Sequence, residues 1–352
     1  MVEGWNGLER QIRSAESAER LRQLRDDFHR LAGAFPLTAD PASATELINR
    51  MHDTIIGRAI ELADQSAGAP SAAYAVLLLG SGGRREQMLS SDQDHCIVYE
   101  PYPQASPEEV SAYASALGLQ IRSCLERVGY PPCDGDVLGS NPLWRNDLPG
   151  WERVIKHWAS VRDFESVRRL LITADARPIA GETSLAERFH NIRDMAIQQN
   201  EESLLPRMLE NTLRHKMLIG VFGHLLTERY GVDSGGIDIK YGAYIPMVNG
   251  IRLLSLAERV RASSTLDRIR LLEQREAVPA EMAAHWREAF HIILELRSMI
   301  PSYEVQGLYA NRGKLPAHLL TKDIKTKLKH ALRVGGELQG YVKRVFVSGG
   351  LL

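Results

Sequence analysis

The stretch that decides the fold begins with Gly80-Ser81-Gly82-Gly83-Arg84-Arg85-Glu86 and continues to Ser90-Ser91-Asp92-Gln93-Asp94. It follows Tyr74-Ala75-Val76-Leu77-Leu78-Leu79, a short apolar run bounded by small residues, proline and glycine, which favours a buried strand over a short helix. The glycines therefore begin where a strand ends. We expect a sharp turn there, because glycine lets the backbone reverse direction and approach a ligand closely.

The glycine run has the composition of a phosphate-binding turn. Successive backbone N–H groups in such a turn, together with the hydroxyl of Ser81, can face phosphate oxygens. The helix-forming residues 85–89 follow, so we expect the turn to open into a short helix whose N-terminus favours anions. The spacing excludes two other glycine motifs, because a Rossmann fingerprint needs a third glycine where Arg85 stands and a Walker loop needs Gly-Lys-Ser/Thr.

An acidic pair follows the turn. Residues 92–99 end in β-favouring side chains and are predicted to form the neighbouring strand. Residues i and i+2 of a strand point to one face, about 7 Å apart along the backbone, so Asp92 and Asp94 can converge on metal ions. Two carboxylates with room for water and phosphate oxygens describe a Mg2+ site, and we expect two ions, with Mn2+ as the alternative. His95 is expected to face away from the metals, and both His95 and Cys96 to pack in the interior.

The order of these features resembles a known signature. Gly80-Ser81, a spacer over 82–91 and then Asp-x-Asp on a strand are similar to the DNA polymerase β nucleotidyltransferase superfamily. Within it, Gly80-Ser81-x-Gly83-Arg84-x-Glu86 and Ser91-Asp92-x-Asp94 resemble the bacterial nucleotidyltransferases related to the uridylyltransferase of the nitrogen-regulatory PII protein. The resemblance covers nearly the whole chain, with further matches at Gly139-Ser140-Asn141-Pro142, 174–181, 236–242 and 319–339.

This resemblance implies an α+β fold. A small mixed sheet with helices forms the polymerase β-type nucleotidyltransferase domain, flanked by N-terminal helices and a C-terminal helical bundle. Apolar residues at helical spacing over 6–33 and 43–64, with a break over 34–41, agree with the N-terminal helices. We expect an N-terminal helical region at 1–70, the catalytic domain at 71–182, and a helical domain at 183–352 that closes over the nucleotide or substrate.

The resemblance also assigns roles to residues. It implies that the nucleotide is bound by Gly80, Ser81, Gly83, Arg84 and Lys240. For Arg84 the alternative is a salt bridge with Glu86 or Asp92, and for Lys240 it is an ordinary solvated lysine. The metals are expected on Asp92, Asp94 and a third carboxylate, which we assign to Asp136 because Val137-Leu138 gives it a strand context, with Asp134 as the alternative.

The implied activity is the metal-dependent transfer of an NMP from an NTP, ATP or UTP, to a hydroxyl acceptor with release of pyrophosphate. The preferred acceptor is a protein, as for the PII uridylyltransferases. Two alternatives stay open: a catalytically silent nucleotide-binding signalling protein and a small-molecule nucleotidyltransferase. At 352 residues the chain is not expected to carry the hydrolase and ligand-sensing regions of those uridylyltransferases.

Composition narrows the classes of partner. A formal net charge of −1 gives no overall basic footprint, so a long nucleic-acid substrate is not expected. No apolar run approaches the roughly 18 residues that cross a bilayer, and the N-terminus lacks a signal-peptide core. The cysteines Cys96, Cys124 and Cys133 show no metal-binding or Cys-x-x-Cys spacing, so we expect reduced thiols and a cytoplasmic protein. Base preference and oligomeric state, including a homo-oligomer, are left open.

Overall fold

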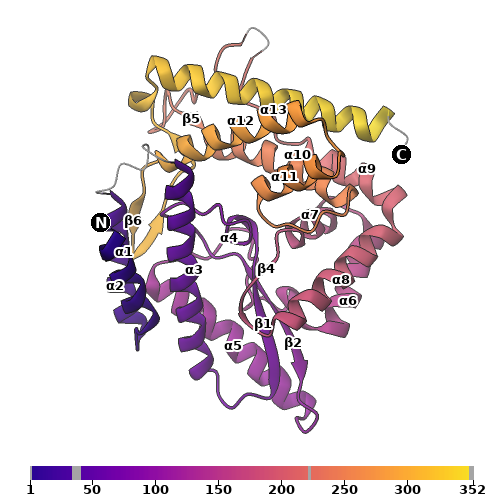
Figure 1. Cartoon of the computed structure of the whole chain (residues 1–352). Coiled ribbons are helices and arrows are strands. Elements are labelled where there is room, and N and C mark those ends of the chain that lie inside the picture. The colour runs from indigo at the N-terminus through magenta and orange to yellow at the C-terminus, as the bar shows by residue number, and fades with distance from the viewer. Residues whose placement is uncertain (1, 34–40, 221–222, 349–352) are drawn as a thin grey trace. The chain divides into compact units, whose positions relative to one another are not determined.

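The computed structural model describes residues 2–33, 41–220 and 223–348 (Figure 1). The chain forms two compact units, each assembled from stretches that are not contiguous in sequence. Unit 1 comprises Met1–His157, Asp175–Met195 and Ser302–Ala310, and unit 2 comprises Trp158–Ala174, Ala196–Pro301 and Asn311–Leu352. The expected domain limits at 70/71 and 182/183 stay predictions. The predicted break over 34–41 lies outside the described residues up to position 40.

Unit 1 combines a small sheet with helices, which confirms the α+β class. Its elements are α1 (Val2–Arg13), α2 (Ala18–Gly33), α3 (Pro41–Gln65), β1 (Ala72–Leu78), α4 (Gly80–Gly83), β2 (His95–Pro101), α5 (Pro107–Val128), the 3-10 helix η1 (Pro142–Trp144), β3 (Arg145–Asp147), β4 (Arg177–Gly181), β6 (Tyr303–Val305) and β7 (Leu308–Ala310). Two further helices, α6 (Leu148–Val161) and α8 (Thr183–Gln199), begin in unit 1 and end in unit 2.

The sheet has the strand order β3-β2-β1-β4. β1 lies at its centre and pairs antiparallel with β2 and β4, while β2 and β3 are parallel. β1 is buried from Ala75 to Leu78, which confirms the buried strand predicted from its apolar run. Because both neighbours of β1 are antiparallel to it, the chain segments that follow β1, precede β2 and precede β4 meet at one end of the sheet.

Helices α1, α2, α3 and α5 build the core against this sheet, and the predicted helices over 6–33 and 43–64 are confirmed. The local signals at α5 are clear: Ser106 and Glu109 form a capping box at its start, and Gly129 ends it with a φ of 99°. On the core side, Leu21, Phe28, Ile55 and Leu117 are fully buried. The N-terminal helices are therefore part of the same core as the strands.

The hairpin of β6 and β7 joins unit 1 although the chain on both sides of it belongs to unit 2. The backbone N–H of Tyr309 donates to the carbonyl of Gly129 at 3.0 Å, and its hydroxyl donates to Asp26 at 2.5 Å. The Tyr309 ring stacks on His29 with 3.7 Å between centroids. Arg25 on α2 is fully buried between the rings of Tyr309 and Tyr130, at 5.0 and 3.3 Å from their centroids.

Unit 2 is predominantly helical. Its elements are α7 (Phe164–Thr173), α9 (Glu201–Thr212), β5 (Ile237–Asp238), the π-helix η2 (Lys240–Tyr244), α10 (Ile245–Ala257), α11 (Thr265–Gln274), α12 (Ala280–Ser298), β8 (Lys314–Leu315), the 3-10 helix η3 (Ala317–Leu319) and α13 (Lys322–Ser348). Its core contains Met247, Ile251, Phe290 and Leu338, all fully buried. Residues 213–236, which lie within the region 183–352 that was expected to be helical, instead follow an irregular path in the part that is described.

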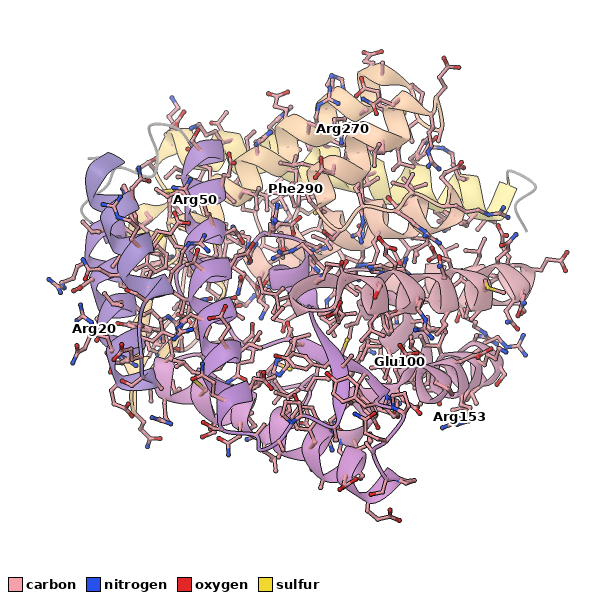
Figure 2. The ribbon with its side chains drawn as sticks, turned by 60° about the horizontal axis from the view of Figure 1, so that its bottom comes forward. Arg20, Arg50, Glu100, Arg153, Arg270 and Phe290 are labelled. Carbon is pink, nitrogen blue, oxygen red and sulfur yellow. The ribbon has the colours of Figure 1, made fainter. Side chains whose placement is uncertain are left out.

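Side chains follow the expected division between core and surface in each unit. The labelled charged residues of Figure 2, such as Arg50 and Glu100 in unit 1, are exposed, whereas Phe290 is buried in unit 2. Within the described ranges, none of the helices combines the length and the apolar character that a membrane crossing requires.

Candidate functional site

The pairing of β1 with β2 brings the glycine run to the aspartates. Leu78 at the end of β1 lies opposite His95 at the start of β2. One residue beyond each strand end, the backbone N–H of Leu79 donates to the carbonyl of Asp94 at 2.9 Å. A Cβ on Gly80 would collide with the Asp94 carboxylate, and the φ of Gly80, 52°, is one that favours glycine. The two strand ends therefore place Gly80 directly against Asp94.

The glycine run itself forms a short helical turn, α4. Among the described residues, no backbone carbonyl accepts a hydrogen bond from the N–H groups of Gly80, Ser81 or Gly82. The hydroxyl of Ser81 lies 3.4 Å from that of Ser91. These three amides and the hydroxyl give the turn the donors that a phosphate group needs.

The helix predicted after the glycines, over 85–89, is wrong. The helical turn is formed by the glycines, and the chain then continues through a turn and an irregular segment. The reason lies at Arg85, whose φ of 55° is left-handed and incompatible with a continuing right-handed helix. Arg85 is exposed, while its neighbours Arg84 and Glu86 are buried.

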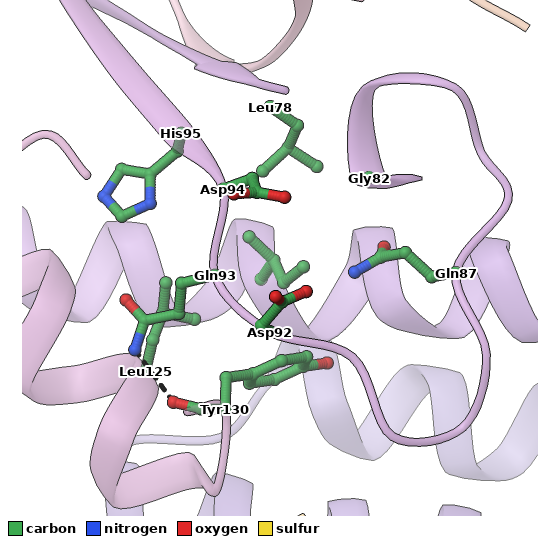
Figure 3. Close-up of a pocket in the computed structure, with 10 residues that line it drawn as sticks. Leu78, Gly82, Gln87, Asp92, Gln93, Asp94, His95, Leu125 and Tyr130 are labelled. Carbon is green, nitrogen blue, oxygen red and sulfur yellow. Dashed lines mark hydrogen bonds between the residues drawn. The ribbon is translucent and has the colours of Figure 1, made fainter. Parts of the chain in front are cut away.

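Asp92 and Asp94 lie in an irregular segment just before β2. The strand predicted to include them begins only at His95, but the alternation of faces persists, since both aspartates are half-buried and Gln93 and His95 are buried. Figure 3 shows both carboxylates turned toward the side where Gln87 lies, with Gln93 and His95 turned the other way. The two aspartates therefore face one side without belonging to a strand.

His95 and Cys96 pack in the interior, as predicted. They are 1% and 0% exposed. Burial lowers the pKa of His95 to about 4 and raises the pKa of the Cys96 thiol. Both side chains are therefore uncharged at neutral pH.

Arg84 is buried in ion pairs beside the turn. Its Nε donates to Glu86 Oε2 at 2.8 Å, and its Nη1 pairs with Asp175, which is fully buried. The Arg84 side chain is only 3% exposed, so a direct contact with phosphate would require these pairs to rearrange. Its predicted phosphate contact stays a prediction.

Arg177 on β4 binds the other end of the turn. Its Nη2 donates to the carbonyl of Gly82 at 2.9 Å and its Nε to that of Gly83 at 3.2 Å, and Nη2 also pairs with Asp53 at 2.6 Å. A cation there stabilises the negative end of the turn, and the Gly82 carbonyl also accepts from the backbone N–H of Arg85 at 3.3 Å. Sequence reasoning did not single out Asp175 or Arg177 as site residues. Its only signal was that 174–181 resembles the family.

Asp134 and Asp136 are both exposed, and no strand forms around them. Asp136 has a left-handed φ of 49°, and its carboxylate accepts from Asn141 Nδ2 at 2.8 Å. The predicted strand context is therefore wrong, because Val137 and Leu138 are buried in a loop. Over the described part of the chain, no three His, Cys, Asp or Glu side chains are grouped to hold a metal ion, so Asp136 does not join the other two aspartates in such a cluster.

A thiol that sequence reasoning missed lies beside the acidic pair. Cys133 is half-buried, accepts from the backbone N–H of Val137 at 3.1 Å and donates to the carboxylate of Asp94. Burial, followed by the negative charge of Asp94, raises the pKa of the thiol. Cys133 is therefore a neutral hydrogen-bond donor that helps to orient Asp94.

Helix α3 supports the segment between the turn and the aspartates. His52 is fully buried, and burial holds its pKa well below the usual value. The neutral ring lies 2.9 Å from the carbonyl of Met88 through Nε2, which must donate, and 2.7 Å from the hydroxyl of Tyr130 through Nδ1. Burial also raises the pKa of Tyr130 to about 12, so its hydroxyl keeps the proton that it donates.

Lys240 lies in unit 2, at the start of the π-helix η2. Its backbone N–H donates to the carbonyl of Gly313 at 3.1 Å, and its Nζ lies 5.4 Å from the centroid of the Tyr241 ring. Asp238, two residues earlier, accepts from the N–H of Tyr241 at 2.8 Å. The role of Lys240 toward phosphates stays a prediction.

The residues present fit a magnesium ion. Asp92 and Asp94 line a cavity of about 10 Å³ that also contains the buried side chain of Gln87, whose Oε1 has no hydrogen-bond partner. Mg2+ is usually bound by one or two carboxylates, with waters and substrate phosphates as its other ligands. Two half-buried carboxylates next to a turn with phosphate-type donors provide that set.

Gly83 shows how closely the turn is packed. A Cβ on it would collide with the carbonyl of Asp175 and lie 2.7 Å from that of Leu78. We expect Gly83→Ala to lower the free energy of unfolding by at least about 2 kcal/mol, because backbone atoms must move apart. Urea unfolding measures this. The control is Gly57→Ala on α3, where a Cβ meets nothing within 4 Å and helix propensity predicts no loss. Equal midpoints for Gly83→Ala and the wild type would contradict the close packing.

Two family models match the chain. "Putative nucleotidyltransferase DUF294" matches residues 27–165, and "Putative nucleotidyltransferase substrate binding domain" matches residues 202–346. A search of curated proteins gave no match. The first match contains α4, Asp92 and Asp94, and the two together cover most of the chain in the order expected from the sequence. The chain therefore belongs to this nucleotidyltransferase family, which confirms the resemblance to nucleotidyltransferases related to the PII uridylyltransferase.

Proposed function

We propose that the protein is a metal-dependent nucleotidyltransferase that transfers an NMP from ATP or UTP to a hydroxyl group and releases pyrophosphate. Family membership supports nucleotidyl transfer in general. One observation supports this site as its location: Asp92 and Asp94 line one cavity with Gly82, and the Asp94 carboxylate lies against Gly80. The N–H groups that can donate to phosphate oxygens and the carboxylates that can bind a metal ion are thus adjacent.

In the proposed reaction, the N–H groups of Gly80, Ser81 and Gly82 and the Ser81 hydroxyl bind the triphosphate. Asp92 and Asp94 hold Mg2+, two ions in the full site and Mn2+ as the alternative, and the bound metal neutralises charge on the attacking and leaving oxygens. The acceptor oxygen forms a bond to the α-phosphorus as the bond to pyrophosphate breaks in line with it. The protein contributes position and electrostatic stabilisation, without a covalent intermediate on the enzyme.

The proposed acceptor is a protein. The second family model is named for substrate binding and covers α9 to α13, so we assign acceptor binding to unit 2. Lys240 lies within the same match, and we propose that it reaches the nucleotide phosphates when that unit closes. The free thiols Cys96, Cys124 and Cys133 support a cytoplasmic location as part of the proposal.

A catalytically silent nucleotide sensor is the second candidate. It is favoured by one observation: within the described residues, no third carboxylate, His or Cys joins the acidic pair in a metal-type cluster. Such a protein would bind an NTP on the turn and would not transfer it. A small-molecule nucleotidyltransferase would differ from the proposed enzyme only in its acceptor.

Incubation of the full chain with each α-labelled NTP and Mg2+, with and without cell lysate, separates these functions. We expect pyrophosphate release and label on a protein of the lysate. Label on a small molecule would replace the protein acceptor, whereas NTP binding without pyrophosphate release under every condition would support the sensor. Omission of Mg2+ with excess chelator is the control, and transfer that persists there would contradict metal dependence.

A further inference from the structure

Gln87 is a buried residue of the site that has no assigned role. Its side chain is 2% exposed, lies in the cavity lined by Asp92 and Asp94, and carries an amide oxygen without a hydrogen-bond partner. Figure 3 shows its amide extending toward the two carboxylates with the nitrogen nearer to them, and a half-turn of the amide about the last side-chain bond brings the oxygen into that place. Leaving a buried acceptor unpaired costs about 1–3 kcal/mol, so folded proteins contain few of them. An orphaned oxygen at this place indicates a ligand that pairs with it.

The chemistry of the cavity selects the kind of ligand. Two carboxylates and an amide oxygen are acceptors, which repel an anion such as phosphate and attract a cation. The cavity of about 10 Å³ has room for about one water-sized group. Amide oxygens, like carboxylates, are ordinary ligands of Mg2+, Mn2+ and Ca2+. The set is therefore suited to a hard divalent cation or to a water that such a cation carries.

The backbone of Gln87 is held in place from α3. The side-chain oxygen of Asn49 accepts from the N–H of Gln87 at 2.9 Å, and its Nδ2 lies 3.4 Å from the Gln87 carbonyl. Asn49 is 2% exposed, and its Nδ2 also donates to the carbonyl of Thr45 at 2.8 Å. On the other side, the Gln87 amide carbon would lie 3.6 Å from a Cβ placed on Gly82. Gln87 is thus fixed between α3 and the glycine turn, as a preorganised ligand would be.

We propose, resting on the metal-dependent function proposed above, that Gln87 supplies the third oxygen of the metal site. Its amide oxygen binds the metal held by Asp92 and Asp94, or a water on that metal. It thus takes the coordination position that was predicted for a third carboxylate. A neutral third donor leaves the protein part of the site with two negative charges. The triphosphate then contributes a larger share of the charge that balances the metals, so metal and NTP bind cooperatively.

The test measures Mn2+ binding by electron paramagnetic resonance and calorimetry, with and without a non-hydrolysable NTP. Gln87→Met removes the oxygen at nearly constant volume, and we expect Mn2+ affinity to fall about tenfold. Gln87→Glu keeps the shape and adds a charge, and we expect Mn2+ to bind at least as tightly as in the wild type at pH 8. Gln120→Met, at an exposed position on α5, is the matched control and should bind as the wild type does.

The opposite effects of the two substitutions separate a metal role from packing. If Gln87→Glu weakens Mn2+ binding as much as Gln87→Met, the amide acts as a donor to the carboxylates, and the inference fails. It also fails if Gln87→Met binds Mn2+ as the wild type does while Asp92→Asn with Asp94→Asn abolishes binding, an outcome that leaves the proposed function intact. If the wild type itself binds no Mn2+ in the presence of NTP, both the inference about Gln87 and the proposed metal-dependent function are overturned. Thermal unfolding of each variant monitors the fold, and Gln87→Glu alone decides the question if Gln87→Met does not fold.

Discussion

Replacing Asp92 and Asp94 together with asparagine is expected to reduce nucleotidyl transfer by a factor on the order of 10³ or more. Asparagine keeps the shape of each side chain but removes the negative charge that holds the metal ions, and metal coordination contributes several kcal/mol of transition-state stabilisation. Both aspartates are half-buried beside the turn, so the change acts inside the site. Pyrophosphate release from α-labelled NTP in Mg2+ measures the loss, and far-UV circular dichroism checks the fold.

Asp134→Asn and Asp136→Asn make the same change at two exposed aspartates, the two candidates for the third carboxylate. Asp134→Asn is expected to retain wild-type transfer. Asp136→Asn tests whether Asp136 is the third carboxylate. A loss of transfer as large as that of the double variant would support this assignment, whereas retained transfer would leave Asp92, Asp94 and Gln87 as the metal ligands. Full transfer by the double variant would refute the metal assignment altogether.

Breaking the buried ion pair of Arg84 with Asp175→Ala is expected to lower the free energy of unfolding by about 3–5 kcal/mol. Asp175 is fully buried and Arg84 is 3% exposed, so removal of the carboxylate leaves in the interior an arginine charge that has lost one of its carboxylate partners. Chemical denaturation measures the loss. The control is Glu100→Gln, which breaks the exposed pair with Arg188, whose N–O distance is 2.7 Å, and should cost at most about 1 kcal/mol.

The same pair offers a second measurement. Because the desolvation of buried charges offsets much of their attraction, replacing all three charged groups with uncharged residues, Arg84→Met with Glu86→Gln and Asp175→Leu, is expected to recover most of the stability lost by Asp175→Ala. NTP affinity of this triple variant then tests the predicted contact of Arg84 with phosphate apart from stability. Unchanged affinity would assign Arg84 to positioning the turn, and a loss of about tenfold or more in a stable protein would support its predicted contact with phosphate.

The local part of the site could be predicted from the sequence because its residues are close along the chain. The apolar strand, the glycine turn and the acidic pair all lie within 74–99, so patterns of burial and spacing contain most of the information. The second strand was predicted to begin at Asp92, three residues before its actual start. Strand propensity cannot detect this, because the backbone before His95 makes only an isolated bridge between Gln93 and Pro132, and regular pairing with β1 begins at His95.

The supporting residues could not be predicted, because they come from distant parts of the chain. Asn49 on α3, Asp175 after α7 and Arg177 on β4 act through single hydrogen bonds and ion pairs that depend on tertiary packing. Apart from the resemblance of 174–181 to the family, nothing in their own neighbourhoods marks them. The predicted strand context of Asp136 failed for a related reason: two apolar neighbours indicate burial, and burial does not require a strand.

The β6–β7 hairpin has a consequence for biosynthesis. Ribosomes deliver the chain from its N-terminus at about 5–20 residues per second, and domains tend to fold as they emerge. Helices α1 to α5 and the sheet can pair early, but Tyr309, which covers His29 and contacts Asp26, is made after most of unit 2. The core of unit 1 is therefore incomplete, with the ring of His29 not yet covered by Tyr309, until the β6–β7 hairpin has left the ribosome.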